Sequence, residues 1–189
     1  MVVDGAVFEA REINAWRGDR HILRDVSFSV RPGEFLKVTG PNGVGKTTLL
    51  RVICGLLPAE TGELWWRGQS VRGRRDEFNF ELGHLGHLNS LKGDLTAREN
   101  LKFLAGLRTT LTAQTIDATL DRVGILSRGD LPARSLSAGQ KRRLALARLL
   151  LADAALWILD EPVTNLDTAG IRLVEELIVD HVERSGLAI

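Results

Sequence analysis

A glycine-rich segment near residue 40 has the residue types and spacing of a phosphate-binding loop. Residues 40–47 read Gly-Pro-Asn-Gly-Val-Gly-Lys-Thr, which fits G-x-x-x-x-G-K-[ST]. Glycines let the backbone curl so that successive N–H groups face phosphate oxygens, and the helix that follows adds the positive end of its dipole. In this pattern Lys46 reaches the β- and γ-phosphates, and the Thr47 hydroxyl ligates Mg²⁺. The predicted nucleotide-binding residues are Gly40, Pro41, Asn42, Gly43, Val44, Gly45, Lys46, Thr47 and Thr48.

Two adjacent acids follow an apolar run at residues 156–159. The run Leu-Trp-Ile-Leu is typical of a buried parallel strand, and Asp160 and Glu161 come directly after it. In phosphate-loop enzymes an acid at such a strand end holds Mg²⁺, so Thr47 and Asp160 are the predicted metal ligands. The next side chain emerges beside the γ-phosphate, where a carboxylate can orient or deprotonate a water. Glu161 is therefore the candidate catalytic base, although acids are also common where a loop simply begins.

A second anion site is predicted where a long helix begins. Residues 136–140 read Leu-Ser-Ala-Gly-Gln and precede a helical run over 138–151. Ser137 can cap that helix, and the free N–H groups of the first turn, together with the helix dipole, attract an anion.

The elements that must position these segments alternate between strands and helices. Extended runs are predicted at 26–30, 35–39, 63–66 and 156–159, and a last strand begins at Leu187. Helices are predicted at 47–54, at 138–151 and in a final amphipathic stretch with Ile171, Val174, Leu177, Ile178 and Val182 on one face. Residues 96–123, with breaks near Gly106 and Gly124, indicate a small helical lobe between strand-bearing halves.

Composition describes one ordinary globular domain spanning 1–189. The chain is 44% hydrophobic and 26% charged, and its net charge of +1 lacks the basic excess of a typical nucleic-acid binder. The longest stretch without Asp, Glu, Lys or Arg is ten residues, 82–91, whereas a membrane-spanning helix needs about 20 apolar residues. The N-terminus is not typical of a secretory signal, and the single cysteine, Cys54, allows no intrachain disulfide.

Taken in order, these motifs resemble those of the ATP-binding cassette (ABC) ATPases. The family has a phosphate loop, then an L-S-G-G-Q segment, here with Ala138 at one glycine position, and then an apolar strand ending in Asp-Glu. The following residues, Glu161-Pro-Val-Thr-Asn-Leu-Asp167, are similar to the family's D-loop. The resemblance covers essentially the whole chain. It implies an α/β fold: a P-loop NTPase core with a mainly parallel sheet, an N-terminal antiparallel β subdomain and an inserted helical subdomain at about 93–152.

The resemblance also implies a mechanism and partners. Two such domains pack head to tail, so that Ser137, Gly139 and Gln140 of one copy serve the γ-phosphate bound by the other. Hydrolysis of ATP with Mg²⁺ then drives a multi-span membrane permease. The expected location is peripheral, on the cytoplasmic face of the inner membrane, and no nucleic-acid partner is expected.

Several segments are similar more narrowly to the ATP-binding subunit of ABC transporters for cytochrome c biogenesis, also called the haem exporter subunit. These are residues 85–92, 95–101, 136–149 and 156–162. In this subfamily a histidine, here His87, occupies the position where most ABC ATPases have a glutamine that senses Mg²⁺ and the membrane partner. His87 and Asp167 are accordingly predicted to act in sensing or coupling. The residues do not decide the transported substrate. It is haem or a different component of cytochrome c maturation, or else the chain serves another small transporter.

Aromatic, histidine and basic residues elsewhere in the chain have both functional and structural interpretations. In the family, an aromatic residue near the start of the chain stacks on adenine. Trp16 is the candidate here, with ordinary core packing as the alternative. Arg17 is the other residue that could align with this adenine-stacking position. His84 and His87 are three positions apart; on a strand they would face opposite sides and could not easily share a metal, so a packing or sensor role is preferred to a metal or haem site. Residues 141–143, Lys-Arg-Arg, are interpreted as a solvated helix face.

The last residues of the sequence, and the motifs that other phosphate-loop proteins require, bear on whether the chain hydrolyses ATP and on its class. The family's switch histidine follows the strand beginning at Leu187, and the sequence stops at Ile189, so we expect truncation before that histidine; an ATP-binding cassette deficient in hydrolysis is the alternative. A GTPase would need N-K-x-D, and no asparagine here is followed by lysine. ABC proteins of DNA repair insert a long coiled coil between the phosphate loop and the L-S-G-G-Q segment, whereas only 87 residues separate Thr48 from Leu136 here. ABC proteins of translation usually carry two cassettes, and this chain has one. Both classes are therefore disfavoured.

Overall fold

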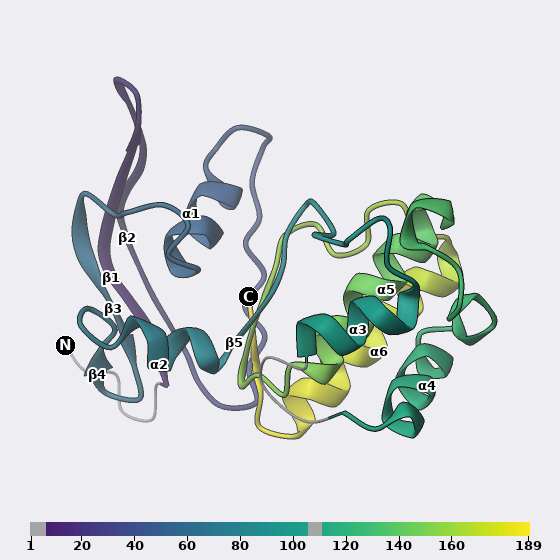
Figure 1. Ribbon diagram of the computed structural model, residues 1–189. Coiled ribbons are helices and arrows are strands. Elements are labelled where there is room, and N and C mark those ends of the chain that lie inside the picture. Colours follow the sequence, from purple (N-terminus) through teal and green to yellow (C-terminus); the bar gives the residue numbers. More distant parts are fainter. Residues whose placement is uncertain (1–6, 106–110) are drawn as a thin grey trace. The chain divides into compact units, whose positions relative to one another are not determined.

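The computed structural model describes residues 7–105 and 111–189, and it divides into two compact units (Figure 1). The first unit comprises the chain up to His84 together with Ala154–Asp160 and Ile178–Ile189. The second comprises Leu85–Asp153 and Glu161–Leu177. The chain therefore passes from the first unit to the second between Asp160 and Glu161, the two acids predicted to act together.

An antiparallel sheet forms one part of the first unit. Its strands lie in the order β2-β1-β3-β4 and appear side by side in Figure 1. Their bounds are β1 (Phe8–Arg17), β2 (Arg20–Val30), β3 (Thr61–Trp66) and β4 (Gln69–Ser70). Along β1 the side chains of Phe8, Ala10, Ile13 and Ala15 are buried, so one face of the sheet contributes to the hydrophobic core of this unit.

A second sheet has the order β5-β6-β7, with β5 (Leu82–Leu85), β6 (Leu156–Leu159) and β7 (Leu187–Ala188). Strands β6 and β7 are parallel, and all four residues of β6 are buried, as the apolar run predicted. The predicted strand at 35–39 is wrong beyond its first residue, because only Phe35 forms a bridge, parallel to Ala188. Residues 36–39 are not assigned to a strand, because extended propensity alone does not form one without a paired neighbour.

Two helices belong to the first unit, α1 (Lys46–Ile53) and α2 (Arg75–Phe80). The hydrophobic residues of α1 that face inward are Leu49, Leu50, Val52 and Ile53. The helix predicted at 47–54 lies one residue earlier, with Cys54 as its C-cap. Gly55 follows with φ +69°, the left-handed conformation that glycine adopts without strain.

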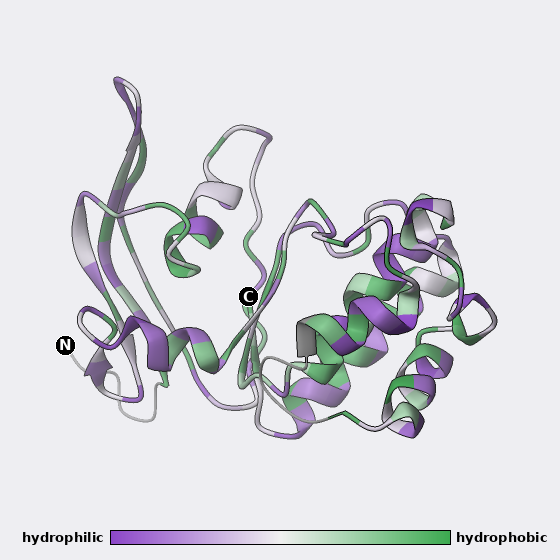
Figure 2. Ribbon diagram, viewed as in Figure 1, coloured by the Kyte–Doolittle hydropathy of each residue, from purple (hydrophilic) through white to green (hydrophobic). Residues whose placement is uncertain are grey.

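The second unit is mainly helical, with α3 (Ala97–Ala105), α4 (Ala113–Arg122) and α5 (Ala138–Leu151) packed on one another. Two short turns, Leu126–Arg128 and Ala133–Ser135, connect α4 to α5, and the final helix, α6 (Thr168–Glu183), begins in this unit. Figure 2 shows the hydrophobic run of α5, whose buried residues include Leu144, Ala145 and Leu146. The predicted break at Gly106 lies outside the described residues.

The predicted combination of an antiparallel N-terminal sheet, a parallel sheet and helices is confirmed. Within residues 7–105 and 111–189, every helix is too short or too polar to traverse a lipid bilayer.

Candidate functional site

The phosphate loop joins the segment after Phe35 to helix α1. Gly43 and Gly45 have φ angles of +83° and +112°, which side-chain-bearing residues rarely adopt. Gly45 is also sterically required, because a Cβ at this position would lie 2.7 Å from Cγ2 of Ile22 in β2. Gly45 is the N-cap of α1, and the first turn of that helix contains no acidic residue. The loop can therefore present helix N–H groups to an anion without competition from an acidic side chain of the helix's own first turn.

Lys46 and Thr47, the first residues of α1, have different partners. The Nζ atom of Lys46 donates hydrogen bonds to the carbonyl oxygens of Gly40 (2.6 Å) and Pro41 (3.0 Å), so its charge lies within the curl of the loop. The hydroxyl of Thr47 donates to Oδ1 of Asp160 at 3.2 Å, and Asp160 is 8% exposed at the end of β6. A hydroxyl and a carboxylate are the oxygen ligands that Mg²⁺ prefers, and Mg²⁺ usually takes few ligands from the protein and the rest from water and phosphates. The pair fits Mg²⁺ in this respect.

The cysteine close to this site is not a reactive thiol. Burial, together with the negative charge of Asp160, raises the pKa of Cys54 to about 12, and the charge of Arg75 only partly opposes this. A thiol with this pKa is protonated at neutral pH, and nucleophilic attack requires the thiolate. Cys54 is therefore assigned to packing beside α1.

Glu161, the candidate base, begins the second stretch of the second unit, with its backbone in the left-handed region at φ +50°. Its Oε2 accepts a hydrogen bond from the hydroxyl of Thr164 at 3.3 Å and lies 3.6 Å from Nδ1 of His87. The side chains of Glu161 and His87 are 57% and 64% exposed. His87 follows β5 rather than lying on it, so the strand argument that placed His84 and His87 on opposite faces is wrong in its premise. Among the described residues, no three His, Cys, Asp or Glu side chains gather as a metal-binding cluster.

Arg142 overturns the interpretation of residues 141–143 as a solvated helix face. Its side chain is 2% exposed, and its guanidinium donates to the carbonyl oxygens of Gly86, Glu161 and Pro162. The neighbouring Arg143 donates to the carbonyl oxygen of Val123 at 3.0 Å. Arg142 is buried because it lies on the same face of α5 as hydrophobic residues that pack inward. Sequence reasoning missed Arg142, and the only signal was its place among buried apolar residues in a helical run.

The predicted second anion site is a capped helix start. The Ser137 hydroxyl accepts from the Gln140 amide at 3.2 Å, and the Gln140 side chain accepts from the Ser137 amide at 3.0 Å, which is a complete capping box at the start of α5. A Cβ at Gly139 would lie 2.9 Å from the carbonyl oxygen of Asn165, so this glycine permits a close backbone approach. The capping role of Ser137 is confirmed, whereas contact of these residues with a phosphate stays a prediction.

Asp167 has a structural role at the start of α6. Its Oδ1 accepts from the Gly170 amide at 2.8 Å and from Arg143 at 3.2 Å. These hydrogen bonds, the Gly170 amide first, hold the pKa of Asp167 below its ordinary value. The carboxylate thus stays ionised, and its predicted part in coupling stays a prediction.

Trp16 lies at the end of β1 and is 48% exposed, so the core-packing alternative is wrong. Its ring stacks on that of His21, with centroids 4.5 Å apart and an interplanar angle of 2°. Arg17, the competing residue, is also exposed. The exposed ring of Trp16 can offer a flat surface, and stacking on adenine stays a prediction.

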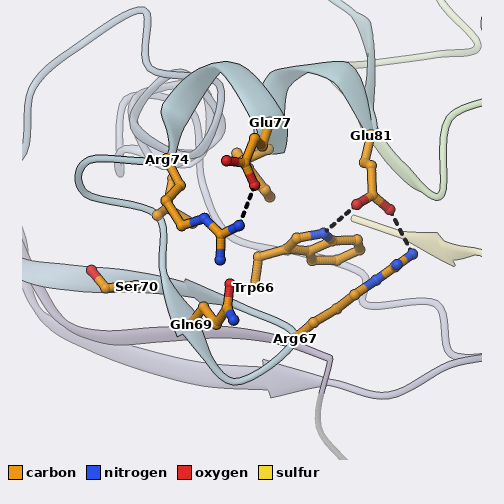
Figure 3. Close-up of a pocket in the computed structure, with 9 residues that line it drawn as sticks. Trp66, Arg67, Gln69, Ser70, Arg74, Glu77 and Glu81 are labelled. Carbon is orange, nitrogen blue, oxygen red and sulfur yellow. Dashed lines mark hydrogen bonds and ion pairs between the residues drawn. The ribbon is translucent and has the colours of Figure 1, made fainter.

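A pocket of about 270 Å³ lies outside all of these segments, at the end of the antiparallel sheet (Figure 3). Arg67 pairs with Glu81 at 2.5 Å, and Glu81 also accepts from the indole of Trp66 at 3.2 Å. Arg74 pairs with Glu77 at 2.6 Å. Because each arginine is matched by a glutamate, the pocket offers no excess charge to a phosphate, and no predicted site residue lines it.

The glycine-rich loop with Lys46 and Thr47, the buried acid that Thr47 contacts, and the capped helix start at Ser137 together define a phosphate-loop ATPase of the ABC class. The model of the ABC transporter family matches residues 23–164, and the chain belongs to this family. As a member it is an ATP-binding protein and an ATPase that energises transport, and its family implies membrane transporter partners.

Named relatives are similar over nearly the whole chain. The chain is 44% identical over 185 residues to the cytochrome c biogenesis ATP-binding export protein CcmA 2 of Cupriavidus metallidurans, covering 97% of this chain and 88% of the relative. It is 49% identical over 175 residues to the CcmA protein of Nitrosococcus oceani, covering 92% of this chain and 79% of the relative. The family resemblance drawn from the motifs is thereby confirmed.

Solved structures share the fold. The ATP-binding subunit of an ABC transporter matches with a TM-score of 0.85 at 23% identity, covering 96% of this chain and 78% of that one. The protein cbiO1 from Clostridium perfringens, part of the ABC transporter complex cbiONQ, matches with a TM-score of 0.79 at 26% identity, covering 98% and 78%.

Proposed function

We propose that this chain binds ATP with Mg²⁺ and hydrolyses it as the ATP-binding subunit of an ABC transporter that exports a component needed for cytochrome c biogenesis. The observation that carries the enzymatic part is the hydrogen bond from Thr47 to Asp160, because it brings the phosphate loop and the acidic strand end together in one unit. The transport role rests on the similarity to the CcmA export proteins over 92–97% of the chain.

Binding of the nucleotide is assigned to residues 40–48. The loop amides and the start of α1 face the phosphates, and Lys46 exchanges the carbonyl oxygens of Gly40 and Pro41 for phosphate oxygens. Thr47 and Asp160 are the residues that would hold Mg²⁺, which supplies positive charge to the phosphate oxygens. Trp16 would offer its ring to adenine.

Hydrolysis is assigned to Glu161. Its carboxylate would accept a proton from the water that attacks the γ-phosphorus. The bond from the γ-phosphorus to the bridging oxygen would break, which leaves ADP, inorganic phosphate and a protonated Glu161. Thr164 and His87 lie beside its Oε2 and would orient that oxygen. His87 and Asp167 would also pass the state of the site to the transporter.

The assembly is proposed from membership of the ABC family. Ser137, Gly139 and Gln140 of a second copy would complete the site around the γ-phosphate in a head-to-tail dimer, and the start of a helix is a place where an anion can bind. The single cassette at 1–189, with a helical subdomain at about 93–152, would dock on a multi-span permease at the cytoplasmic face of the inner membrane. That docking makes it a peripheral subunit.

Two substitutions separate nucleotide binding from hydrolysis. We expect Lys46→Ala to weaken binding of a fluorescent ATP analogue by at least about tenfold, because the cationic phosphate contact is lost. Glu161→Gln should keep that affinity, lower hydrolysis about 10²–10⁴-fold and trap an ATP-bound dimer, which size exclusion with light scattering would detect. The exposed residues Lys102 and Glu175 offer matched controls, Lys102→Ala and Glu175→Gln.

The outcomes distinguish the parts of the proposal. Unchanged ATP affinity in Lys46→Ala would reject the phosphate-loop assignment, and parental hydrolysis in Glu161→Gln would reject Glu161 as the base. If the parental chain binds ATP but does not hydrolyse it even with its permease present, the proposed hydrolysis is rejected. The chain would then be an ATP-binding cassette deficient in hydrolysis. Co-purification of the chain with a permease from membranes tests the peripheral location.

A further inference from the structure

Arg142 is the least exposed charged side chain among the described residues, at 2%. Burying a guanidinium is costly unless hydrogen bonds replace its hydration. The side chain projects from α5, five residues after the capping serine Ser137. Hydrogen bonds to other segments replace the hydration that this guanidinium loses.

The guanidinium bridges two segments that are distant in the sequence. Its Nη1 donates to the carbonyl oxygen of Gly86 at 2.7 Å and to Oδ1 of Asn89 at 3.2 Å. Its Nη2 donates to the carbonyl oxygen of Glu161 at 2.7 Å, and its Nε donates to that of Pro162 at 3.0 Å. One planar group thus holds the loop that contains His87 and the turn that begins with Glu161.

The two shortest hydrogen bonds of Arg142, each 2.7 Å, hold the backbone next to His87 and the backbone of Glu161, the candidate base. Gly86 directly precedes His87, and the bond to Glu161 is made to its own carbonyl group. Glu161 has φ +50°, a conformation that persists only where the surroundings hold it. With both segments held, Nδ1 of His87 lies 3.6 Å from Oε2 of Glu161.

We propose that Arg142 is a positioning residue for ATP hydrolysis. It sets the direction of the Glu161 carboxylate through the Glu161 backbone, and it ties that carboxylate to the His87 loop so that a displacement of the loop is passed to the base. The inference rests on the proposed role of Glu161. Arginine suits the task because its fork reaches acceptors on several sides at once, whereas the single nitrogen of lysine does not.

The test replaces Arg142 with glutamine and with lysine in the full chain. We expect Arg142→Gln to lower kcat about 10- to 100-fold, since a small misplacement of a catalytic group costs up to about 100-fold. The dissociation constant for a fluorescent ATP analogue should change by less than about twofold, because the groups that the guanidinium is seen to hold belong to Gly86, Asn89, Glu161 and Pro162, outside the proposed nucleotide-binding residues 40–48. Arg142→Lys should recover part of kcat. The exposed Arg172 on α6 provides the charge-matched control, Arg172→Gln, which should leave kcat unchanged.

A double variant shows whether Arg142 acts through Glu161. In the Glu161→Gln background, measured by single-turnover hydrolysis, Arg142→Gln should cause no further loss, because residues that act as a unit are not additive. The double variant should still form the ATP-trapped dimer, which shows that it is folded. Equal further loss in that background, or a parallel fall in ATP affinity and kcat, would overturn the inference in favour of a merely structural role.

The same measurements separate this inference from the proposed function. If Glu161→Gln is inactive while Arg142→Gln has parental kcat, the role of Arg142 is rejected and that of Glu161 stands. If Glu161→Gln keeps the parental rate, the role of Glu161 is rejected, and the positioning role of Arg142 is rejected with it.

Discussion

The hydroxyl of Thr47 lies 3.2 Å from the carboxylate of Asp160, although 113 positions separate the two residues in the chain. Thr47 belongs to the first turn of α1, and Asp160 directly follows β6. The contact joins the end of the phosphate loop to the end of a fully buried strand. The two oxygen ligands assigned to Mg²⁺ therefore lie together in one compact unit.

Removing the Thr47 hydroxyl should weaken the use of Mg²⁺. We expect Thr47→Val to raise the Mg²⁺ concentration for half-maximal hydrolysis and to lower the maximal rate about 10- to 100-fold, equivalent to about 1.4–2.7 kcal/mol of barrier. Thr47→Ser keeps a hydroxyl and should stay close to the parental protein. Magnesium titrations of the ATPase rate make the comparison, and coinciding curves for the valine and serine variants would contradict the assignment.

Gly45 should tolerate no side chain. In Gly45→Ala the new Cβ would meet Ile22 at 2.7 Å in addition to the strain of φ +112°. Gly18 offers a matched control, because it has φ +57° and no atom within 4 Å of an added Cβ. We expect Gly18→Ala to cost about 1–2 kcal/mol of unfolding free energy from backbone strain alone, and Gly45→Ala to cost roughly 1–3 kcal/mol more. Urea unfolding measures both, and equal costs would show that the contact with Ile22 is relieved by movement.

The sequence predicted the parts of the site whose geometry is local. The glycine pattern at 40–45, the cap at Ser137 and the apolar run before Asp160 each depend on neighbours within a few positions, and each has the expected structure. The cap at Ser137 and the run that follows it also predicted the helix at 138–151 with its observed bounds.

The missed features depend on distant backbone groups. Arg142 receives its role from the carbonyl oxygens of Gly86 and Glu161, 56 and 19 positions away, and a backbone carbonyl has no residue type that a sequence pattern could detect. The strand at 35–39 was overpredicted for a related reason, since pairing with a distant strand, and not the local pattern, decides which of these residues join a sheet, and only Phe35 forms a bridge. Both errors concern tertiary partners rather than local propensity.

The capping role of Ser137 and its proposed contact with a phosphate can be separated. Ser137→Ala removes the side-chain acceptor of the capping box and should cost about 1 kcal/mol of unfolding free energy. Ser137→Asp is a comparable N-cap and should keep that stability, yet its charge should repel a phosphate and prevent the ATP-trapped dimer in the Glu161→Gln background. Thermal unfolding and light scattering measure the two effects.

Ser135, two residues earlier and exposed, provides the control Ser135→Ala, which should change neither quantity. Formation of the trapped dimer by Ser137→Asp would show that this helix start does not face the γ-phosphate.

His181 should make the stability of the first unit dependent on pH. Its ring stacks on Trp157 with centroids 3.9 Å apart, and its Nε2 donates to the carbonyl oxygen of Leu187 at 3.1 Å. Burial lowers the pKa of His181 below its ordinary value, and hydrogen bonds to the Leu187 and Ala155 carbonyl oxygens only partly oppose this. The unfolded chain therefore binds a proton more readily than the folded chain does. The contribution of this residue is fully present above about pH 6.5 and is lost as the pH falls through the lowered pKa.

Replacing His181 with phenylalanine keeps an aromatic ring against Trp157 and removes the titrating group. Between pH 7.5 and pH 5 we expect the unfolding free energy of His181→Phe to fall less steeply than that of the parental protein, because the unfolded state of the variant no longer gains a proton at this position. Urea unfolding at several pH values gives the two slopes. Parallel slopes would show that the buried imidazole does not contribute, since His181→Phe changes one titrating group and retains the stacked ring.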